Sequence, residues 1–206
     1  MKSCLDNLPT SDELILNIPG ADSVELYDLR ILCAAARKKR RVLEIGTRYA
    51  RTTANLAKFC APGGAVVTVD INQTDARKTL ECLDPSLAEK IFLIEGDSHS
   101  LDYSELGPFD LVFIDGDHYP QGVAADTKAI LPHLVPGALI VWHDYTSLPV
   151  LTGIKTLQID HSQIGAYMGY SRGAHLNLPE GSLQTEMSIV RDFMSNFLEQ
   201  FKTKEA

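Results

Sequence analysis

The sequence predicts an α/β fold in which a doubly wound, mostly parallel sheet of seven strands carries helices on both faces. Short apolar runs rich in Val and Ile alternate with segments of helical spacing, and Gly and Pro residues mark the turns between them. The runs are continuously apolar, which is typical of parallel strands that are buried on both faces. With 206 residues, 45% of them hydrophobic, the chain has the size of a single domain with one core.

Five apolar runs predict the parallel strands, since each has the length of a buried strand. In chain order they are Val42 to Ile45, Ala65 to Val69, Ile91 to Ile94, Leu111 to Ile114 and Ala138 to Trp142. After Pro149 the pattern changes, and two further runs predict strands joined by a tight connection at Ser171-Arg172-Gly173. These two runs are Ile164 to Tyr170 and Ala174 to Leu178.

Segments of helical spacing lie between and after these runs. They are Thr52 to Phe59, Ala76 to Leu83, Val123 to Leu134 and Gly153 to Ile159. Pro132 must kink or end the third segment, because proline removes a backbone donor inside a helix. A further helical stretch opens at Asp22 and Glu25 and ends in the basic run Arg37 to Arg41, since cations are favourable at a helix C-terminus.

The last segment predicts an amphipathic helix whose large apolar side chains share one stripe. The stripe consists of Val190, Phe193, Met194, Phe197, Leu198 and Phe201. Packing on the sheet of the same chain is the favoured cover, because amphipathic helices most often face their own core. A homodimer formed through this helix is the alternative.

Composition and charge exclude several classes of protein. The chain has 19 Lys+Arg against 27 Asp+Glu, and its net charge of −8 would repel a phosphate backbone, so nucleic acid is not an expected partner. No apolar run approaches the roughly 20 residues of a membrane span, and residues Met1 to Glu13 lack the apolar centre of a signal peptide. We expect a cytoplasmic protein without a membrane partner.

Acidic residues follow each predicted parallel strand, at the edge where open α/β sheets bind ligands. In strand order these segments are Glu44-Ile45-Gly46, Asp70, Glu95-Gly96-Asp97, Asp115-Gly116-Asp117-His118 and His143-Asp144. Carboxylates at adjacent strand ends repel one another unless cations lie among them. The pattern therefore favours a ligand with sulfonium and ammonium groups, a divalent metal, or both, and it disfavours a pyrophosphate.

The first loop argues against a dinucleotide. A dinucleotide site needs the pattern G-x-G-x-x-G after the first strand, whereas this chain reads Gly46-Thr47-Arg48-Tyr49-Ala50-Arg51 and lacks two of the three glycines. Arg48 and Arg51 keep a nicotinamide dinucleotide as a minor alternative, because they offer charge to a phosphate. Asp70 follows Gly46 by about the 20 residues at which an acidic side chain reaches a ribose hydroxyl pair.

Five segments in this order resemble the class I S-adenosylmethionine-dependent methyltransferases, and their joint order is more specific than any one of them. They are Val42-Leu43-Glu44-Ile45-Gly46-Thr47-Arg48-Tyr49-Ala50-Arg51-Thr52-Thr53, Val69-Asp70-Ile71, Glu95-Gly96-Asp97-Ser98, Phe113-Ile114-Asp115-Gly116-Asp117-His118 and Leu139-Ile140-Val141-Trp142-His143-Asp144-Tyr145. The chain is most similar to small bacterial members with the Asp-Gly-Asp-His signature, whose layout is similar to catechol and caffeoyl-coenzyme A O-methyltransferases. The resemblance covers about residues 22 to 145.

The resemblance implies a Rossmann-like methyltransferase fold over residues 1–206, with an N-terminal lid segment at 1–21, a cofactor-binding core at 22–145, and C-terminal strands and the amphipathic helix at 146–206. Gly46 and the following backbone would approach the methionine part of S-adenosylmethionine, and Asp70 would hold the ribose hydroxyls. The implied cofactor contacts are Glu44, Gly46, Thr52, Asp70, Ile71, Asp97, Ser98 and Asp115.

The implied chemistry is O-methylation of a small hydroxylated molecule, assisted by Mg²⁺ or another divalent cation. Asp115, His143 and Asp144 lie at the positions of the metal ligands, although catechol-type enzymes have Asp-Asn where this chain has His-Asp. His118 falls where those enzymes carry their catalytic Lys, so it is the expected general base, with Asp115 as its catalytic neighbour. A second departure is Ala50, which stands where most relatives have Gly.

Three other functions remain open or fail on the residues themselves. A methyltransferase-like domain that binds S-adenosylmethionine without turnover fits the same motifs. His118 and His143 with a carboxylate also match the two-histidine, one-carboxylate face of non-haem iron oxygenases. Gly169-Tyr170-Ser171-Arg172-Gly173 matches the nucleophile elbow of serine hydrolases, but the acid and the histidine do not follow it in the required order.

Overall fold

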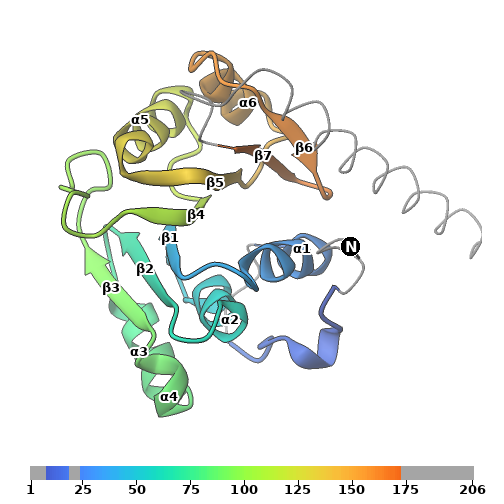
Figure 1. Ribbon diagram of the computed structural model, residues 1–206, viewed down its shortest axis with the longest axis vertical. Helices are drawn as coiled ribbons and strands as arrows, with labels where there is room; N and C mark the ends of the chain where they lie inside the picture. Colours follow the sequence, from blue (N-terminus) through green and yellow to red (C-terminus); the bar gives the residue numbers. More distant parts are fainter. Residues whose placement is uncertain (1–7, 19–23, 173–206) are drawn as a thin grey trace, which may run out of the picture. The chain divides into compact units, whose positions relative to one another are not determined.

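The computed structural model describes residues 8–18 and 24–172, all of which lie in one compact unit, Met1–Ala174. Strands and helices alternate along most of this unit, as Figure 1 shows. The strands are β1 (Arg41–Ile45), β2 (Ala65–Asp70), β3 (Ile91–Glu95), β4 (Phe109–Ile114), β5 (Leu134–Trp142), β6 (Ser162–Ile164) and β7 (Met168–Arg172). The helices are η1 (Ser11–Glu13), α1 (Leu26–Ala36), α2 (Arg51–Phe59), α3 (Thr74–Cys82), α4 (Pro85–Ala88), α5 (Pro120–Ile130), η2 (Leu131–His133) and α6 (Leu148–Lys155).

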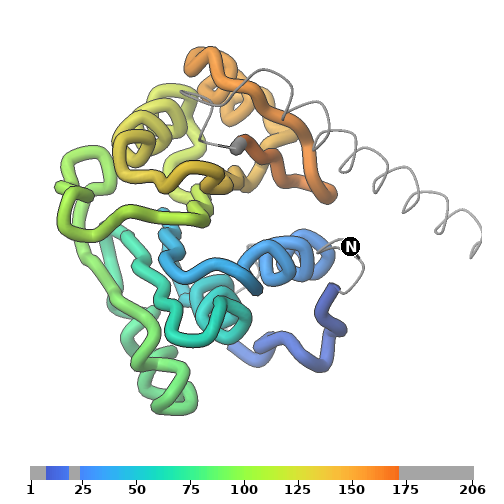
Figure 2. The backbone as a smooth tube through the Cα atoms, viewed as in Figure 1, coloured from blue at the N-terminus to red at the C-terminus, as the bar shows by residue number. Residues whose placement is uncertain are grey.

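The strands form one seven-stranded sheet in the order β3-β2-β1-β4-β5-β7-β6, which confirms the predicted fold class. β1 to β5 are parallel, and β7 joins the sheet antiparallel to β5 and to β6. The chain winds outward from β1 to β3 and then returns to pair β4 with β1, a path that Figure 2 shows as a tube. The strand order reverses between β1 and β4, and open α/β sheets bind ligands at such a switch point.

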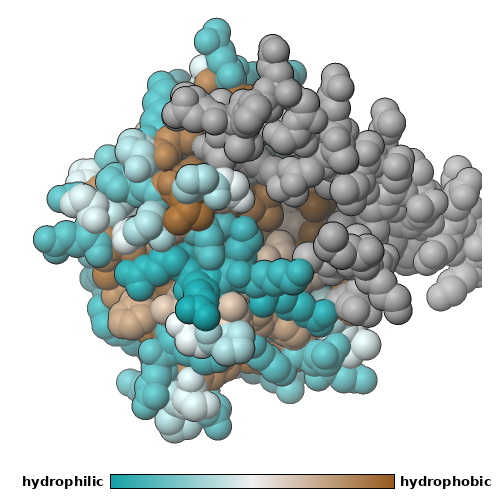
Figure 3. Space-filling model, in the orientation of Figure 1, coloured by the Kyte–Doolittle hydropathy of each residue, from teal (hydrophilic) through white to brown (hydrophobic). Residues whose placement is uncertain are grey.

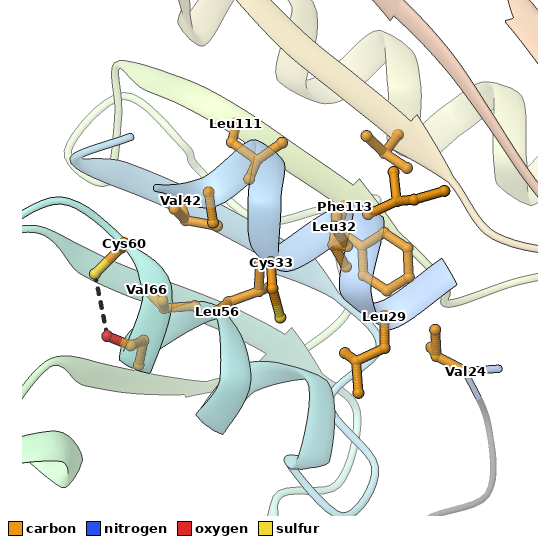
Figure 4. Packing of buried hydrophobic residues seen from close by; sticks show 14 of the residues in the cluster. Val24, Leu29, Leu32, Cys33, Val42, Leu56, Cys60, Val66, Leu111 and Phe113 are labelled. Atoms are coloured by element: carbon orange, nitrogen blue, oxygen red, sulfur yellow. Dashed lines mark hydrogen bonds between the residues drawn. The ribbon is translucent and has the colours of Figure 1, made fainter. Parts of the chain in front are cut away.

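The two faces of the sheet carry separate apolar cores, because successive side chains of a strand point to opposite faces. Val42 of β1 packs with Leu32 of α1 and Leu56 of α2 on one face, as Figure 4 shows. Leu43, the next residue of β1, belongs to the other cluster, with Val123 of α5 and α6 residues. Helices therefore cover both faces, and the carboxyl ends of the parallel strands stay free of this packing.

All five predicted parallel strands form, within a few residues of the expected ends. The third predicted helix is shorter than expected: α5 ends at Ile130, and Leu131–His133 form a 3₁₀ turn around Pro132. Proline causes this, because it cannot donate the backbone hydrogen bond that would continue the helix. The helix predicted at Gly153 to Ile159 begins and ends earlier than expected, as α6 at Leu148–Lys155 with proline in its first turn.

The hairpin at the edge of the sheet differs from the predicted one. The turn lies at Gly165–Tyr167, between β6 and β7, so the prediction of a single strand from Ile164 to Tyr170 was wrong. Gly165 has a φ of +78°, and the buried carboxylate of Asp28 in α1 accepts hydrogen bonds from the N–H groups of Ala166 and Tyr167 at 2.7 Å each. Ser171, predicted in the connection, lies inside β7 opposite Ile140, which is no setting for a nucleophile elbow.

Three predictions fall on residues that the structure does not describe. The segment Ala174 to Leu178, the apolar stripe of the last helix, and residues 1–7 and 19–21 of the N-terminal segment lie outside the described residues. Among the helices that are described, none has both the length and the apolarity needed to cross a membrane.

Candidate active site

A cavity of about 730 Å³ lies at the carboxyl ends of the five parallel strands, where the sequence predicts the site. Residues from the end of each of these strands line it, from Gly46 after β1 to His143 and Asp144 after β5. Most of the predicted site residues meet here, namely Gly46, Thr52, Asp70, Ile71, Asp97, Ser98, Asp115, His118, His143 and Asp144. A volume of this size is typical of pockets that bind a cofactor or another ligand of similar size.

The loop after β1 contains three residues with a positive φ: Gly46, Arg48 and Ala50. Gly46 has a φ of +97°, and a Cβ atom there would lie 2.2 Å from the carbonyl oxygen of Asp115, so only glycine fits between β1 and β4. Ala50 precedes α2 with φ +60° and ψ +22°, which is a conformation that glycine adopts at lower cost. Ala50 is fully buried and is not among the residues that line the cavity. Its methyl group therefore strains the loop without entering the space for a ligand.

Asp70, at the end of β2, holds this loop in place. Its Oδ2 atom accepts hydrogen bonds from the N–H groups of Thr47 and Arg48 at 2.9 Å each, and Oδ1 accepts one from the N–H of Asn72 at 3.1 Å. A carboxylate oxygen can accept more than one hydrogen bond. Oδ1 thus keeps acceptor capacity for a hydroxyl group in the cavity.

Glu44 lies beneath the loop and does not line the cavity, although the sequence predicts it as a cofactor contact. Its Oε2 atom accepts hydrogen bonds from the hydroxyl groups of Thr53 and Thr68. Burial raises the pKa of Glu44 to about 8 against the lowering effect of these hydrogen bonds, and the negative charges of Asp115 and Asp70 raise it further. The side chain is therefore neutral at neutral pH, and it supports the loop from inside the protein.

The segment after β3 rests on a buried carboxyl group from α5. The Ser98 hydroxyl donates to Asp126 Oδ1 at 2.6 Å, and His99 Nε2 lies 3.3 Å from the same oxygen. Burial raises the pKa of Asp126, which is fully buried, while Ser98 and His99 lower it. The Asp97 carboxylate accepts a hydrogen bond from the N–H of His99 at 2.9 Å. Asp126 thereby positions two residues that line the cavity.

At the ends of β4 and β5, two histidines and two carboxylates form a compact group, which we call the His–Asp cluster: Asp115, His118, His143 and Asp144. One potential ligand atom from each of the four lies within 4.8 Å of the other three. Asp144 has a φ of +49°, in the left-handed region that Asp and Asn tolerate better than other side chains. This backbone turn follows directly after His143 and brings both side chains into the cluster.

Charges within the cluster offset one another. Burial by itself would raise the pKa of Asp115, but the contacts with His118 and His143 hold it below its ordinary value. The Asp115 contact raises the pKa of His118 against the effect of burial, with further contributions from Asp144 and Asp117. Burial alone would lower the pKa of His143, yet Asp115 and Asp144 raise it. Each histidine is thus held beside two negative carboxylates.

His143 makes the cluster suitable for a metal ion. Only 7% of its side chain is exposed, and neither ring nitrogen makes a hydrogen bond to the described residues. Buried polar atoms without a partner are rare in proteins and call for an explanation. A metal ion would accept the lone pair of one of these nitrogens, so the residues present fit a metal.

Several residues of the cavity wall were not predicted as cofactor, metal or catalytic residues. They are Thr47, Tyr49, Gly96, His99, Gly116 and Asp117, together with Arg48 and Arg51, which were expected only as partners of a phosphate. Each lies within three positions of a predicted residue in the chain, so closeness in sequence was the available signal. Asp126 could not be found in this way, because it lies within α5, far in sequence from Ser98, from whose hydroxyl group it accepts a hydrogen bond. Figure 3 shows hydrophilic side chains gathered across the middle of the face viewed in Figure 1, with hydrophobic surface beside them.

A family described as "Methyltransferase domain" matches residues 43–145 of the chain, which span β1 to the end of β5. Catechol O-methyltransferase of Mycobacterium tuberculosis (strain ATCC 25618 / H37Rv) is 39% identical over 126 residues, which are 55% of this chain and 57% of that protein. The chain thus spans little more than half the length of this curated relative.

Solved structures are similar over a larger share of the chain. An O-methyltransferase from Bacillus cereus in complex with SAH has a TM-score of 0.58 at 25% identity, covering 75% of this chain and 82% of that one. The cofactor-bound protein Rv0187 from MTB has a TM-score of 0.62 at 24% identity, covering 77% of this chain and 84% of that one. The similarity to Rv0187 is evidence for the fold of this chain.

Proposed function

The chain belongs to the methyltransferase-domain family, and from this premise we propose that it transfers a methyl group from S-adenosylmethionine to a hydroxyl oxygen of a small molecule. One observation carries the proposal: a single cavity joins Asp70 and Asp97, at the ends of β2 and β3, to the His–Asp cluster at the ends of β4 and β5. A donor and an acceptor therefore have adjoining places in one cavity. The catechol O-methyltransferase and the SAH-bound relative support the choice of oxygen as the acceptor atom.

The β1 to β3 side of the cavity fits the donor. Asp70 Oδ1 has acceptor capacity for a ribose hydroxyl, and Ile71, with 78% of its surface exposed, offers an apolar face to a base. A Cβ atom on Gly96 would meet no protein atom within 4 Å, so this wall of the cavity is open. Thr52 lies in the first turn of α2, where N–H groups favour a carboxylate. The proposed donor contacts of Gly46, Asp97 and Ser98 fit the same side, and that of Asp115 lies where this side meets the ends of β4 and β5.

The β4 and β5 side fits the acceptor. S-adenosylmethionine supplies a methyl group on a sulfonium, and its transfer to oxygen needs an in-line arrangement of the reacting atoms. The hydroxyl of the acceptor must also lose its proton, and a positioned base typically contributes about 10²- to 10⁴-fold to the rate. Asp115, at the end of β4, lies between the two sides and belongs to the His–Asp cluster. We propose that this cluster holds the acceptor hydroxyl and lowers the cost of removing its proton.

The two predicted roles of the cluster compete for the same atoms. His118 Nε2, the expected base, lies 2.9 Å from Asp144 Oδ2 and 3.4 Å from Asp115 Oδ1, both of which belong to the expected metal ligands. In the metal-free protein, His118 can accept a proton and share it with Asp144. With a divalent ion bound to Asp115, His143 and Asp144, the ion would lower the pKa of a bound hydroxyl. The donor atoms fit either role.

Binding and turnover measured on the same preparation test the proposal. We expect calorimetry to show that S-adenosylmethionine and S-adenosylhomocysteine each bind with a stoichiometry of one per chain. We also expect release of S-adenosylhomocysteine in a screen of phenols, sugars and carboxylic acids, run with and without a chelator. Binding without turnover on any acceptor would favour the non-catalytic alternative, and no binding of either compound would overturn the proposed function.

A further inference from the structure

We propose that the His–Asp cluster binds one transition-metal dication, such as Mn²⁺, Fe²⁺, Co²⁺ or Zn²⁺, in preference to Mg²⁺, and that His118 is a ligand of this ion and not the general base. The inference deepens the proposed function and rests on it, because the cluster lies in the cavity assigned to donor and acceptor. It adds a fourth ligand to the three expected from the sequence, and it names the class of ion.

The spacing of the four atoms matches that of neighbouring ligands around one ion. Nitrogen and oxygen alternate around a ring: His118 Nε2 lies 3.4 Å from Asp115 Oδ1, Asp115 Oδ1 lies 3.1 Å from His143 Nδ1, His143 Nδ1 lies 3.4 Å from Asp144 Oδ2, and Asp144 Oδ2 lies 2.9 Å from His118 Nε2. Ligands at about 2.1 Å from an ion are about 3.0 Å apart at right angles and about 3.4 Å apart in a tetrahedron. The distances of 3.1, 3.4 and 3.4 Å fall within this range, and the 2.9 Å distance lies just below it.

The burial of His143 points to the same ion independently of the spacing. Its ring lies in the interior, edge-on to Phe113 at 6.3 Å between centroids, and it forms no hydrogen bond with the described residues. Nδ1 nevertheless faces both carboxylates of the cluster. A buried imidazole normally satisfies its nitrogens with hydrogen bonds. A bound ion would take the place of a hydrogen-bond partner for Nδ1, the nitrogen of His143 that faces the cluster.

The donor atoms select the class of ion. Mg²⁺ prefers oxygen ligands in near-ideal octahedral geometry and keeps several waters, whereas imidazole nitrogen suits first-row transition metals. Two of the four donors here are imidazoles. Replacing oxygen donors by nitrogen therefore shifts the preference away from Mg²⁺. This shift has two sources. His143-Asp144 stands where catechol-type enzymes have Asp-Asn, and His118 adds a second imidazole.

The same geometry argues against a free base at position 118. The Nε2 atom of His118 faces both carboxylates, and 51% of its side chain is exposed, so the side chain is free to adjust to an ion. A nitrogen that donates its lone pair to an ion has none left for a proton. The opposing explanation is a ring of ion pairs in which both histidines are protonated and no metal binds.

Calorimetry on the full chain, stripped with a chelator and dialysed, separates these explanations. We expect one Mn²⁺ per chain, bound at least about tenfold more tightly than Mg²⁺ in a parallel titration. The His118→Ala variant should bind Mn²⁺ at least about tenfold more weakly than the wild type, since loss of a ligand costs no less than loss of an outer-shell partner. His133→Ala is the matched control. His133 lies directly before the start of β5, whereas the cluster lies at the other end of this strand, so the substitution should leave the affinity unchanged.

A second readout does not depend on affinity. The electron spin resonance of bound Mn²⁺ should show coupling to imidazole nitrogen, and His118→Asn should reduce that coupling while His133→Ala preserves it. No Mn²⁺ binding, equal affinity for Mg²⁺, or unchanged binding by both His118 variants would overturn the inference. S-adenosylmethionine binding is measured on the same samples. If S-adenosylmethionine binds and Mn²⁺ does not, the inference fails alone; if Mn²⁺ binds and S-adenosylmethionine does not, the proposed function fails.

Discussion

At the ends of β2 and β3, the carboxylates of the cavity accept hydrogen bonds from the backbone: Asp70 accepts three N–H groups, and Asp97 accepts one. At the ends of β4 and β5, the carboxylates of Asp115 and Asp144 face imidazole rings. Among the described residues, no backbone N–H donates a hydrogen bond to either of these carboxylates. Backbone N–H groups are fixed, neutral donors. Imidazoles are titratable groups and metal ligands.

This difference divides the cavity into a rigid side and a reactive side. The expectation that carboxylates along the whole edge need outside cations was too broad, because hydrogen bonds stabilise those at β2 and β3 and burial keeps Glu44 neutral. At β4 and β5, the carboxylates of Asp115 and Asp144 face imidazole groups, which can titrate and bind metal ions. The predictions below test this division, from the largest expected effect to the smallest.

The reactive side should fail most when its central carboxylate loses its charge. Asp115→Asn keeps the shape of the side chain but removes the charge that both histidines contact. We expect methyl transfer to fall by about 10²- to 10⁴-fold, the usual range for the loss of a proton-handling group. The measurement is the rate of S-adenosylhomocysteine release with an acceptor from the screen.

Asp102→Asn provides the matched control for this variant. Asp102 accepts a hydrogen bond from the N–H of Ser104 at 2.9 Å in a turn that does not line the cavity. Its rate should equal that of the wild type. A rate for Asp115→Asn within a factor of about three of the wild type would show that the reactive side lies elsewhere.

The rigid side should lose donor affinity when Asp70 loses its charge. Asp70→Asn keeps an oxygen for the N–H groups of Thr47 and Arg48, so the loop should hold its shape. A hydrogen bond to a charged group contributes about 1.5–3 kcal/mol, so we expect S-adenosylmethionine to bind about 10- to 100-fold more weakly. Calorimetry measures this, and Mn²⁺ affinity should not change.

Asp84→Asn is the control for Asp70. Asp84 also accepts a backbone N–H, from Ser86 at 2.9 Å, but it caps α4 outside the cavity. If the two variants bind S-adenosylmethionine equally well, Asp70 is a loop-stabilising residue and makes no contact with the donor.

The neutral state of Glu44 predicts a pH dependence of stability. The ordinary pKa of 4.5 is raised to about 8 in the folded protein, so the unfolded chain loses this proton first as the pH rises. Between these values the folded state binds one proton more. The stabilising contribution is therefore complete below about pH 4.5 and is lost by about pH 8, at about 1.4 kcal/mol per pH unit.

Glu44→Gln should remove this slope, because the amide resembles the neutral carboxyl group and does not titrate. Urea unfolding measured from about pH 5 to about pH 8 should show the variant gaining stability relative to the wild type as the pH rises. A constant difference between the two proteins across this range would mean that Glu44 is ionised in the folded state.

The smallest effect is expected for Ala50→Gly. Relief of the left-handed conformation gains about 1–2 kcal/mol, but glycine loses about 0.4–1 kcal/mol through the unfolded chain and about 0.8 kcal/mol through the lost buried methyl group. The free energy of unfolding should change by less than about 1 kcal/mol, and S-adenosylmethionine affinity should stay the same, because Ala50 does not line the cavity. A clear gain in affinity would show that the methyl group crowds the donor.

Much of the fold and of the cavity could be predicted from the sequence, because both depend on local patterns. Val42 and Leu43 show this, since these successive residues of β1 are both apolar and their side chains pack on opposite faces of the sheet. Acidic residues after parallel strands necessarily meet at one edge, so Asp70 and Asp115 were found without a structure. The Asp126 support of Ser98 could not be predicted, because the two residues lie 28 positions apart in different elements.

The sequence by itself determined the alternation of strands and helices, the edge at which the site forms, and most of the residues that line it. Only the tertiary structure decided where the hairpin turns, since the Asp28 carboxylate that holds Ala166 lies 138 positions earlier in the chain. It also decided that His118 and His143 face the same two carboxylates and that Glu44 lies beneath the cavity. Local patterns report what neighbouring residues do, whereas burial and contacts between distant side chains arise only when the chain is folded.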